Sequence, residues 1–237
     1  MKAFEKKPIS VTEQINLLTQ RGLIIDDVVK AEIYLKNISY YRLSAYWYTF
    51  LELPQSEHIF KPHSNFKDVI NTYIFDRKLR FLIFEEIERI EIALRSQIIY
   101  HYCHEFGNNW YEDKNLYTRS NYYYRFNELI QSEIDKTNEV FIRHYKSTYH
   151  QPENPPAWMI LELASFGQIS MLYKNLRGNN RSKREIAKHF GVTEKVLESW
   201  LECLAYVRNS CAHHMRLWNR KLPKSPLKPQ KTDYTWI

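Results

Sequence analysis

Glycine, cysteine and long apolar runs are scarce in this chain. Glycine contributes only five of the 237 residues. Because tight turns and β-bulges favour glycine, this scarcity argues against a strand-rich sandwich or barrel. The three cysteines are scattered and odd in number, which excludes a regular disulfide framework. No apolar stretch approaches the ~18 residues of a membrane span, and none follows Met1–Ser10 as it would in a signal peptide. These absences predict a cytoplasmic protein with free thiols and no membrane partner.

Aromatic residues and positive charge are abundant by contrast. The chain holds 18 Tyr, 12 Phe and 6 Trp, and its hydrophobic fraction of 44% is enough for a real core. Lys and Arg outnumber Asp and Glu by 34 to 27, which gives a formal net charge of +7. A basic protein of this size tends to meet anions, with nucleic acid first and acidic membrane surfaces second. Charge alone also fits a protein with a slightly positive surface and no such partner.

Apolar residues recur at helical spacing along most of the chain, and no segment shows the alternation of a strand. The sequence therefore predicts an all-α fold. Ser10 and Glu13 have the spacing of a capping box at the first helix. The longest periodic stretch, Asn65 to about His104, is expected to pack against the last long helix, Thr193 to about Cys211. Further helical segments are expected within Asp26–Leu35, Tyr122–Tyr149, Ala157–Leu176 with a break near Ser165–Gly167, and Ser182–Phe190.

Three parts are expected along the chain. Residues 1–64 form an N-terminal helical segment packed on the core, and residues 65–221 form the helical core itself. Residues 222–237 form a basic tail, because Pro223, Pro226 and Pro229 alternate with lysines and favour an extended chain.

Arg208 stands out in the last long helix. With Leu197 at 0° and about 100° per residue, Leu201 lies near 40°, Leu204 near 340° and Arg208 near 20°. Arg208 thus falls at the centre of the apolar stripe, where a charged side chain needs an ion-pair partner or a functional role that offsets the cost of its burial. It either pairs with a carboxylate of the core or serves a chemical function.

The residues after Arg208 favour a chemical function. The string Arg208-Asn209-Ser210-Cys211-Ala212-His213-His214 supplies a fixed cation, an amide and two imidazoles within seven residues. Cleavage of an RNA phosphodiester needs a base, an acid and a cation at the phosphate, and requires no metal. In an unbroken helix, however, His213 lies about 140° from Arg208. Either the helix ends or bends between them, or a second copy of the motif completes the site, and we favour the second copy together with some change in the helix.

Glu91 is the expected partner on the long helix. It lies inside the apolar arc of Ile87, Leu94 and Ile98, and Arg95 follows at the i+4 position. Glu91 and Arg95 form an ordinary intrahelical pair in the first interpretation. In the second, Glu91 belongs to a group that orients Arg208, and Glu88 is the other acidic residue that could take this place. The nearby Asp76–Arg80 cluster is interpreted as a solvated helix face, with phosphate contact as the alternative.

Competing chemistries have weaker signals. His101, Cys103 and His104 are close in sequence, as are Cys211, His213 and His214, but neither group has zinc-ligand spacing. A glycine-rich phosphate loop and a Gly-x-Ser-x-Gly elbow are both missing from the sequence. We therefore expect no metal and no cofactor.

The stretch from Arg208 to His213 resembles the Arg-x(4–6)-His signature of HEPN-domain ribonucleases. The string through Arg220 resembles the bacterial abortive-infection (Abi) family of phage-resistance proteins. Three further segments share this resemblance: Ile38–Ser44, Phe75–Arg80 and Pro156–Met159. It covers about residues 8–221.

The resemblance implies a HEPN-like helical bundle with additional N-terminal helices. It also implies RNA cleavage in phage defence or toxin-like growth arrest. Arg208 and His213 match the signature positions, Asn209 matches the polar residue that often follows the arginine, and His214 has no fixed role. A small non-coding RNA is a plausible partner, because some relatives are associated with one.

The sequence thus predicts a metal-independent endoribonuclease that acts as a homodimer with a shared active site. A non-catalytic RNA-binding protein or scaffold remains the main alternative. A distant third is a DNA-binding regulator that uses the helix–turn–helix-like spacing of Glu185–Trp200. The basic residues expected to contact RNA are Arg77, Lys78, Arg80, Lys183, Arg184, Arg216 and Arg220, together with the lysines of the tail.

Overall fold

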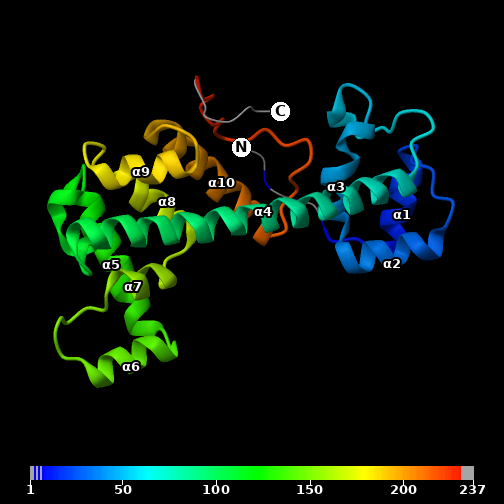
Figure 1. Cartoon of the computed structure of the whole chain (residues 1–237). Helices are drawn as coiled ribbons and strands as arrows, with labels where there is room; N and C mark the ends of the chain where they lie inside the picture. The colour runs from blue at the N-terminus through cyan, green and yellow to red at the C-terminus, as the bar shows by residue number, and fades with distance from the viewer. Residues whose placement is uncertain (1–2, 4, 6, 231–237) are drawn as a thin grey trace. The chain divides into compact units, whose positions relative to one another are not determined.

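The computed structural model describes residue 3, residue 5 and residues 7–230. That part of the chain contains ten α-helices, four 3-10 turns and no strand beyond isolated bridges, which confirms the all-α prediction (Figure 1). None of the described helices is both long enough and apolar enough to cross a bilayer. The helices are α1 (Val11–Gln20), α2 (Val28–Ile38), α3 (Tyr40–Trp47), α4 (Phe66–Phe106), α5 (Ser120–Lys136), α6 (Val140–Thr148), α7 (Ala157–Leu163), α8 (Phe166–Asn175), α9 (Arg181–His189) and α10 (Glu194–Ala212). The 3-10 turns are η1 (Tyr48–Phe50), η2 (Gln55–Glu57), η3 (Trp110–Glu112) and η4 (Lys114–Leu116).

The chain forms two compact units. Unit 1 holds the described residues up to Phe81 together with Arg216–Trp218, and unit 2 holds Leu82–Met215 with the described residues from Asn219 onward. The division therefore falls inside α4 rather than at the expected boundary after residue 64. Segment 216–218 rejoins unit 1 from far along the sequence.

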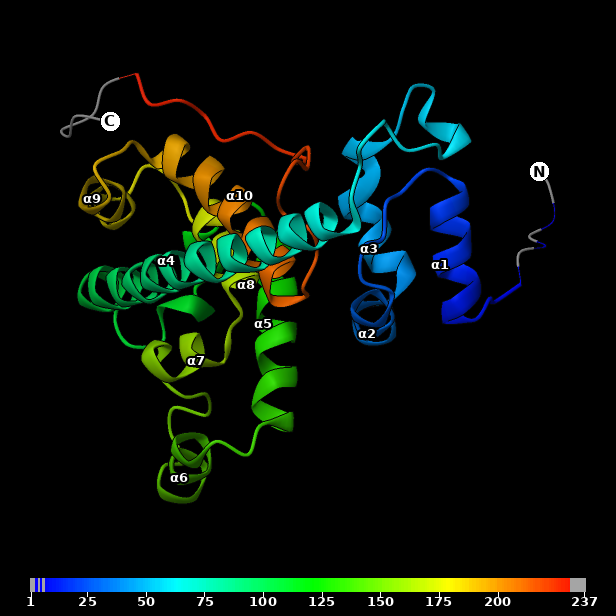
Figure 2. The ribbon, with the colours of Figure 1, turned by 90° about the vertical axis from the view of Figure 1, so that its right-hand side faces the viewer.

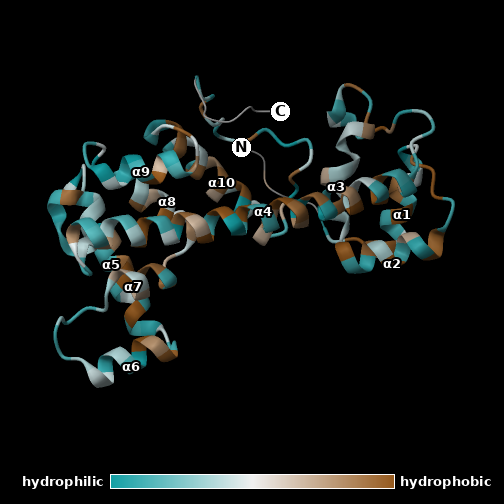
Figure 3. Ribbon diagram, viewed as in Figure 1, coloured by the Kyte–Doolittle hydropathy of each residue, from teal (hydrophilic) through white to brown (hydrophobic). Residues whose placement is uncertain are grey.

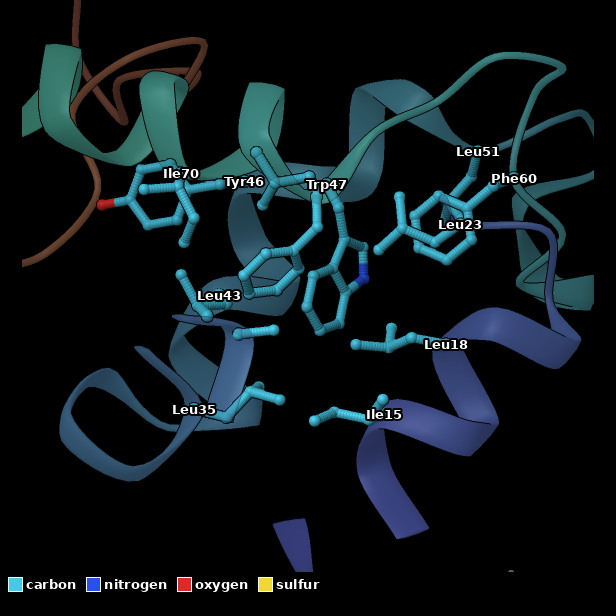
Figure 4. Close-up of a cluster of buried hydrophobic side chains, with 13 residues drawn as sticks. Ile15, Leu18, Leu23, Leu35, Leu43, Tyr46, Trp47, Leu51, Phe60 and Ile70 are labelled. Carbon is cyan, nitrogen blue, oxygen red and sulfur yellow. The ribbon is translucent and has the colours of Figure 1, made fainter. Parts of the chain in front are cut away.

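Unit 1 is built on a cluster of buried side chains (Figure 4). Trp47 packs edge-on against Tyr40 and Phe60, and Leu18 and Leu43 are fully buried around it. The Ser10–Glu13 capping box forms at α1, and the Asp27 carboxylate accepts a hydrogen bond at the start of α2. Local sequence signals thus explain where both helices begin.

Unit 2 is organised around α10. This helix packs most extensively on α8 and next on α9, and the two views agree in placing α8 beside it (Figure 2). The apolar residues Ile87, Leu94 and Ile98 of α4 are buried as their spacing predicts, although hydrophilic positions interrupt the apolar ones along this helix (Figure 3). The expected helical region 122–149 is divided into α5 and α6, and the expected break near Ser165 separates α7 from α8.

Part of the basic tail lies along α10. Trp200 donates its indole N–H to the Leu227 carbonyl at 2.7 Å, and the Leu227 N–H donates to Ser199 Oγ at 2.9 Å. Lys224 pairs with Glu202, and its hydrogen bond holds the pKa of that carboxyl below its usual value. The tail is thus attached to unit 2 as far as Leu227, while the part of the predicted tail from residue 231 to 237 lies outside the described residues.

Candidate active site

The last turn of α10 ends within the Arg208–His214 string. His213 is the C-terminal cap, and its N–H still donates to the Asn209 carbonyl at 3.0 Å. The N–H of His214 then donates to the Cys211 carbonyl at 3.1 Å and that of Met215 to the Ser210 carbonyl at 2.9 Å. These two bonds are the Schellman arrangement. The helix therefore ends at Ala212, between Arg208 and His213, and completion of the site by a second copy of the motif stays a prediction.

His214 takes the left-handed position that ends the helix. Its φ is 56°, where glycine is usual and histidine is uncommon. A residue other than glycine in this conformation is held there by its surroundings. The turn after α10 thus has a defined path, and Asn209, His213 and His214 are exposed around it.

Arg208 is held by Glu91 on α4. The Arg208 Nε lies 3.6 Å from Glu91 Oε2, and the guanidinium stacks over Phe84 with 5.6 Å to the ring centroid. The Arg208 Nε is buried without a hydrogen bond of its own, although the side chain as a whole is 32% exposed. One side of the guanidinium is therefore neutralised by the protein, and the rest is open to solvent.

Arg95 fixes the other oxygen of the same carboxylate. Its Nη2 lies 2.8 Å from Glu91 Oε1, and its Nη1 donates to the carbonyls of Leu161 and Ala164. These carbonyls belong to the C-terminal end of α7, where cations are favourable. The expected pairing of Glu91 with Arg95 or Arg208 is confirmed for both arginines at once. Glu88 takes no part in this arrangement and is exposed.

Comparison with family models gives a match over residues 33–219 to the family described as Abi-like protein. The chain belongs to this family. The matched region contains Arg208, Asn209 and His213, and membership indicates a role in abortive infection, a form of phage defence. Comparisons with curated proteins and with solved structures give no match.

The basic residues of this Abi-like protein divide into exposed and buried groups. Arg77, Lys78 and Arg184 are exposed, and the Arg77 guanidinium lies 5.4 Å from the Phe81 ring centroid. Arg220 is partly buried over Tyr206. Burial therefore leaves the prediction of RNA contact standing for Arg77, Lys78 and Arg184, and Arg220 is only partly accessible.

The prediction that Arg80 and Lys183 contact RNA is wrong, because both side chains are buried. Arg80 is 6% exposed and pairs with the fully buried Asp76, so the prediction of a solvated face is wrong for these two members of the Asp76–Arg80 cluster and holds for Arg77 and Lys78. Lys183 is 2% exposed, and its ammonium pairs with Glu198 at 2.6 Å. A buried and paired cation has no open coordination for a phosphate. Arg216, which is partly buried, donates to the Ala45 carbonyl and so also serves the fold.

Sequence reasoning missed two parts of this arrangement. From its place in the apolar arc of the long helix, Phe84 was expected to be an ordinary core residue. Its ring lies seven residues before Glu91 and therefore on the same helix face, which is the signal for a site where the Arg208 guanidinium stacks. The second missed part is the set of groups that bind Asp76. Of these, the sequence indicates only Arg80, which follows Asp76 at the i+4 position. Among the described residues, no group of three or more His, Cys, Asp or Glu side chains is arranged to hold a metal ion.

A pair of neighbouring variants tests the division of the basic residues. Lys183→Ala is expected to destabilise the fold by about 3–5 kcal/mol, because Glu198 loses its buried partner. Arg184→Ala, on the same helix, is expected to change stability by less than about 0.5 kcal/mol and to lower the salt slope of RNA binding by about one. Urea unfolding and RNA binding at several salt concentrations measure the two effects. Equal stability of the two variants would contradict the assignment of Lys183.

Proposed function

We propose that this Abi-like protein is a metal-independent endoribonuclease of a phage-defence or toxin-like system, with Arg208, Asn209 and His213 as its catalytic residues. The observation that carries the proposal is the placement of Arg208. Its guanidinium is held by Glu91 and Phe84 while part of it stays open to solvent, one turn before the exposed His213. A preorganised cation that is followed within five residues by exposed amide and imidazole groups suits a negatively charged transition state. The resemblance to the HEPN signature assigns the same residues.

The reaction is an attack of the ribose 2′-oxygen on the adjacent phosphorus. The O2′–P bond forms and the P–O5′ bond breaks, so the products are a 2′,3′-cyclic phosphate and a 5′-hydroxyl. The 2′-hydroxyl loses a proton to one imidazole, and the 5′-oxygen gains a proton from a second acid. His213 carries out proton transfer, Arg208 stabilises the charge on the phosphorane, and Asn209 positions the phosphate.

Two copies of the chain complete the site in this proposal. In-line displacement needs a base and an acid on opposite sides of the phosphate, and each chain supplies one His213. A two-fold axis beside the end of α10 brings Arg208, Asn209 and His213 of both chains to one cleft, as a self-complementary interface allows. His214 is the second imidazole available to each chain.

Cleavage in the presence of EDTA tests the proposal directly. Purified protein with excess EDTA is expected to cut single-stranded RNA and to leave a 2′,3′-cyclic phosphate and a 5′-hydroxyl, because no step requires a metal. Enzymatic end-labelling of the products identifies both ends, and sequencing of co-purified RNA identifies any bound non-coding RNA. Cleavage that EDTA abolishes, or products with a 5′-phosphate, would refute the mechanism. RNA binding without cleavage would favour the scaffold, and preference for duplex DNA would favour a regulator.

A further inference from the structure

A cavity lies between α5 and α8 of unit 2, apart from the candidate active site. Its volume is about 350 Å³, which is within the range of small-molecule sites in proteins. Every described residue that lines it belongs to unit 2, and Arg208, Asn209 and His213 are not among them. Its apolar wall is formed by Tyr117, Tyr122, Phe126, Leu129, Met171 and Leu172. The cavity therefore offers an apolar enclosure for part of a ligand.

Three of these side chains are aromatic. Phe126 and Tyr117 are 6% and 2% exposed, and Tyr122 is partly buried. The Tyr117 hydroxyl donates a hydrogen bond to the Tyr111 carbonyl at 2.8 Å, so this side chain offers its ring to a ligand rather than a donor. Aromatic side chains bind planar rings by stacking and by edge contacts, and every nucleobase has a face for such contacts. The wall thus favours a planar ring.

A buried amide supplies a polar group to the same enclosure. Asn175, the last residue of α8, lines the cavity and is 5% exposed. Its Oδ1 accepts a hydrogen bond from the Thr118 hydroxyl at 2.6 Å, and its backbone carbonyl accepts the Thr118 N–H at 2.7 Å. Within the described part of the chain, no group accepts a hydrogen bond from its Nδ2. Buried amide donors are normally satisfied, so a ligand with an acceptor beside Asn175 gains this hydrogen bond.

Two other features of the cavity favour an anion. Arg125 on α5 is exposed, and it alone among the described lining residues carries a charge. It forms no ion pair with any described residue. Gly167 lies in the first turn of α8, where backbone N–H groups lack partners inside the helix and the helix dipole is positive. Phosphate groups bind to arginine side chains and to helix N-termini alike.

These features together require a ligand with a planar ring, an acceptor and a separate anionic group. Gly167 and Asn175 are about 12 Å apart along the axis of α8, since each helical residue rises about 1.5 Å. One inorganic anion does not reach both residues. A nucleoside monophosphate carries its phosphate at one end and the acceptors of its base at the other, whereas a fatty acyl chain has no acceptor to offer Asn175.

We propose that this cavity binds a nucleoside monophosphate unit, with the base in the aromatic enclosure and the phosphate at Arg125 and the first turn of α8. Asn175 Nδ2 donates to an acceptor on the base. The unit is either a free nucleotide or one nucleotide of an RNA strand, because the two share this chemistry. Binding at the cavity does not depend on the proposed cleavage of RNA.

Titration of the full-length protein with AMP and with UMP tests the site. NMR follows the side-chain amide signals of Asn175, because the base engages this donor. We expect these signals to shift with the nucleotides, and we expect adenosine and uridine to bind at least about tenfold more weakly because they lack the phosphate. A short single-stranded RNA is titrated in the same way. A shift with RNA alone assigns the site to a strand, and a shift with the mononucleotides assigns it to a free nucleotide.

Two substitutions are expected to weaken binding while the fold is retained. Arg125→Ala removes the cation of the site, and Gly167→Leu adds a side chain at the cavity wall. Within 4 Å, a Cβ at Gly167 meets only Ser165 Oγ, at 3.9 Å, which is an ordinary contact. We expect each variant to bind the nucleotides at least about tenfold more weakly than wild type. Arg143→Ala is the matched control, since Arg143 is also an exposed arginine of unit 2 but lies on α6, and it should bind as wild type does.

Thermal unfolding checks that all three variants fold. Asn175 signals that shift neither with mononucleotides nor with RNA would overturn the inference, and so would undiminished binding to Arg125→Ala and Gly167→Leu. Nucleosides that bind as tightly as their monophosphates would refute the phosphate contact. A shift at Asn175 with a fatty acid, and with no nucleotide, would assign the cavity to an acyl ligand instead.

Discussion

Replacing His213 by alanine is expected to abolish RNA cleavage, with a loss of about 10²–10⁴-fold in rate, while RNA binding and the fold are retained. Proton transfer by a positioned side chain typically contributes this much. His213 is exposed and follows the last residue of α10, so its removal leaves no cavity and no unpaired buried group. Cleavage rates under single-turnover conditions, RNA binding and thermal unfolding measure the three properties.

His144→Ala is the matched control, because His144 is also an exposed histidine of unit 2 but lies on α6. It is expected to cleave at the wild-type rate. A His213→Ala protein that cuts RNA within tenfold of wild type would remove His213 from the mechanism.

The same variant also probes the shared site. An excess of inactive His213→Ala chain mixed with wild-type chain should lower cleavage, since each mixed dimer lacks one of the two imidazoles that the shared site needs. Full activity in a strictly monomeric protein would refute the homodimer. A wild-type protein that binds RNA without cutting it would leave the scaffold as the better description.

Helix phase explains why part of the candidate site could be predicted from the sequence. The apolar stripes of α4 and α10 fix which way each helix faces, and this periodicity alone places Arg208 and Glu91 on buried faces. A charge on a buried face must find a partner, so a carboxylate of α4 was expected near Arg208, with Glu91 or Glu88 as the candidates. The second pairing, with Arg95, follows from the i+4 spacing.

The pattern of charges in the sequence gave wrong predictions for cations that are buried beside partners that the sequence did not identify. Arg80 and Lys183 look like ordinary surface cations in sequence, but Asp76 and Glu198 neutralise them inside the protein. The backbone donors of Leu217 and Trp218, which bind Asp76, carry no sequence signal at all, because every residue except proline has an N–H. The end of α10 was nevertheless predicted to within one residue, about Cys211 against Ala212, although His214 rather than a glycine occupies the left-handed position that follows it.

Glu91→Gln is expected to destabilise the protein by about 2–4 kcal/mol and to lower cleavage by about tenfold or more. The Glu91 carboxylate serves Arg95 with one oxygen and Arg208 with the other, and all three side chains are at least partly buried. Glutamine keeps one acceptor but presents N–H groups to the second arginine, so one guanidinium stays unpaired. Urea unfolding measures the stability, and single-turnover cleavage measures the effect on the orientation of Arg208.

Glu85→Gln provides the comparison on the same helix. Glu85 pairs with Arg89 at the same i+4 spacing, with 3.1 Å between charged atoms, but both side chains are more than 60% exposed. An exposed pair of this kind contributes about 0.3–0.5 kcal/mol, so this variant should retain nearly full stability and cleavage. Similar losses in the two variants would mean that Glu91 acts only as a helix-surface charge. Loss of stability with unimpaired cleavage would mean that Glu91 supports the fold and that the orientation of Arg208 does not depend on it.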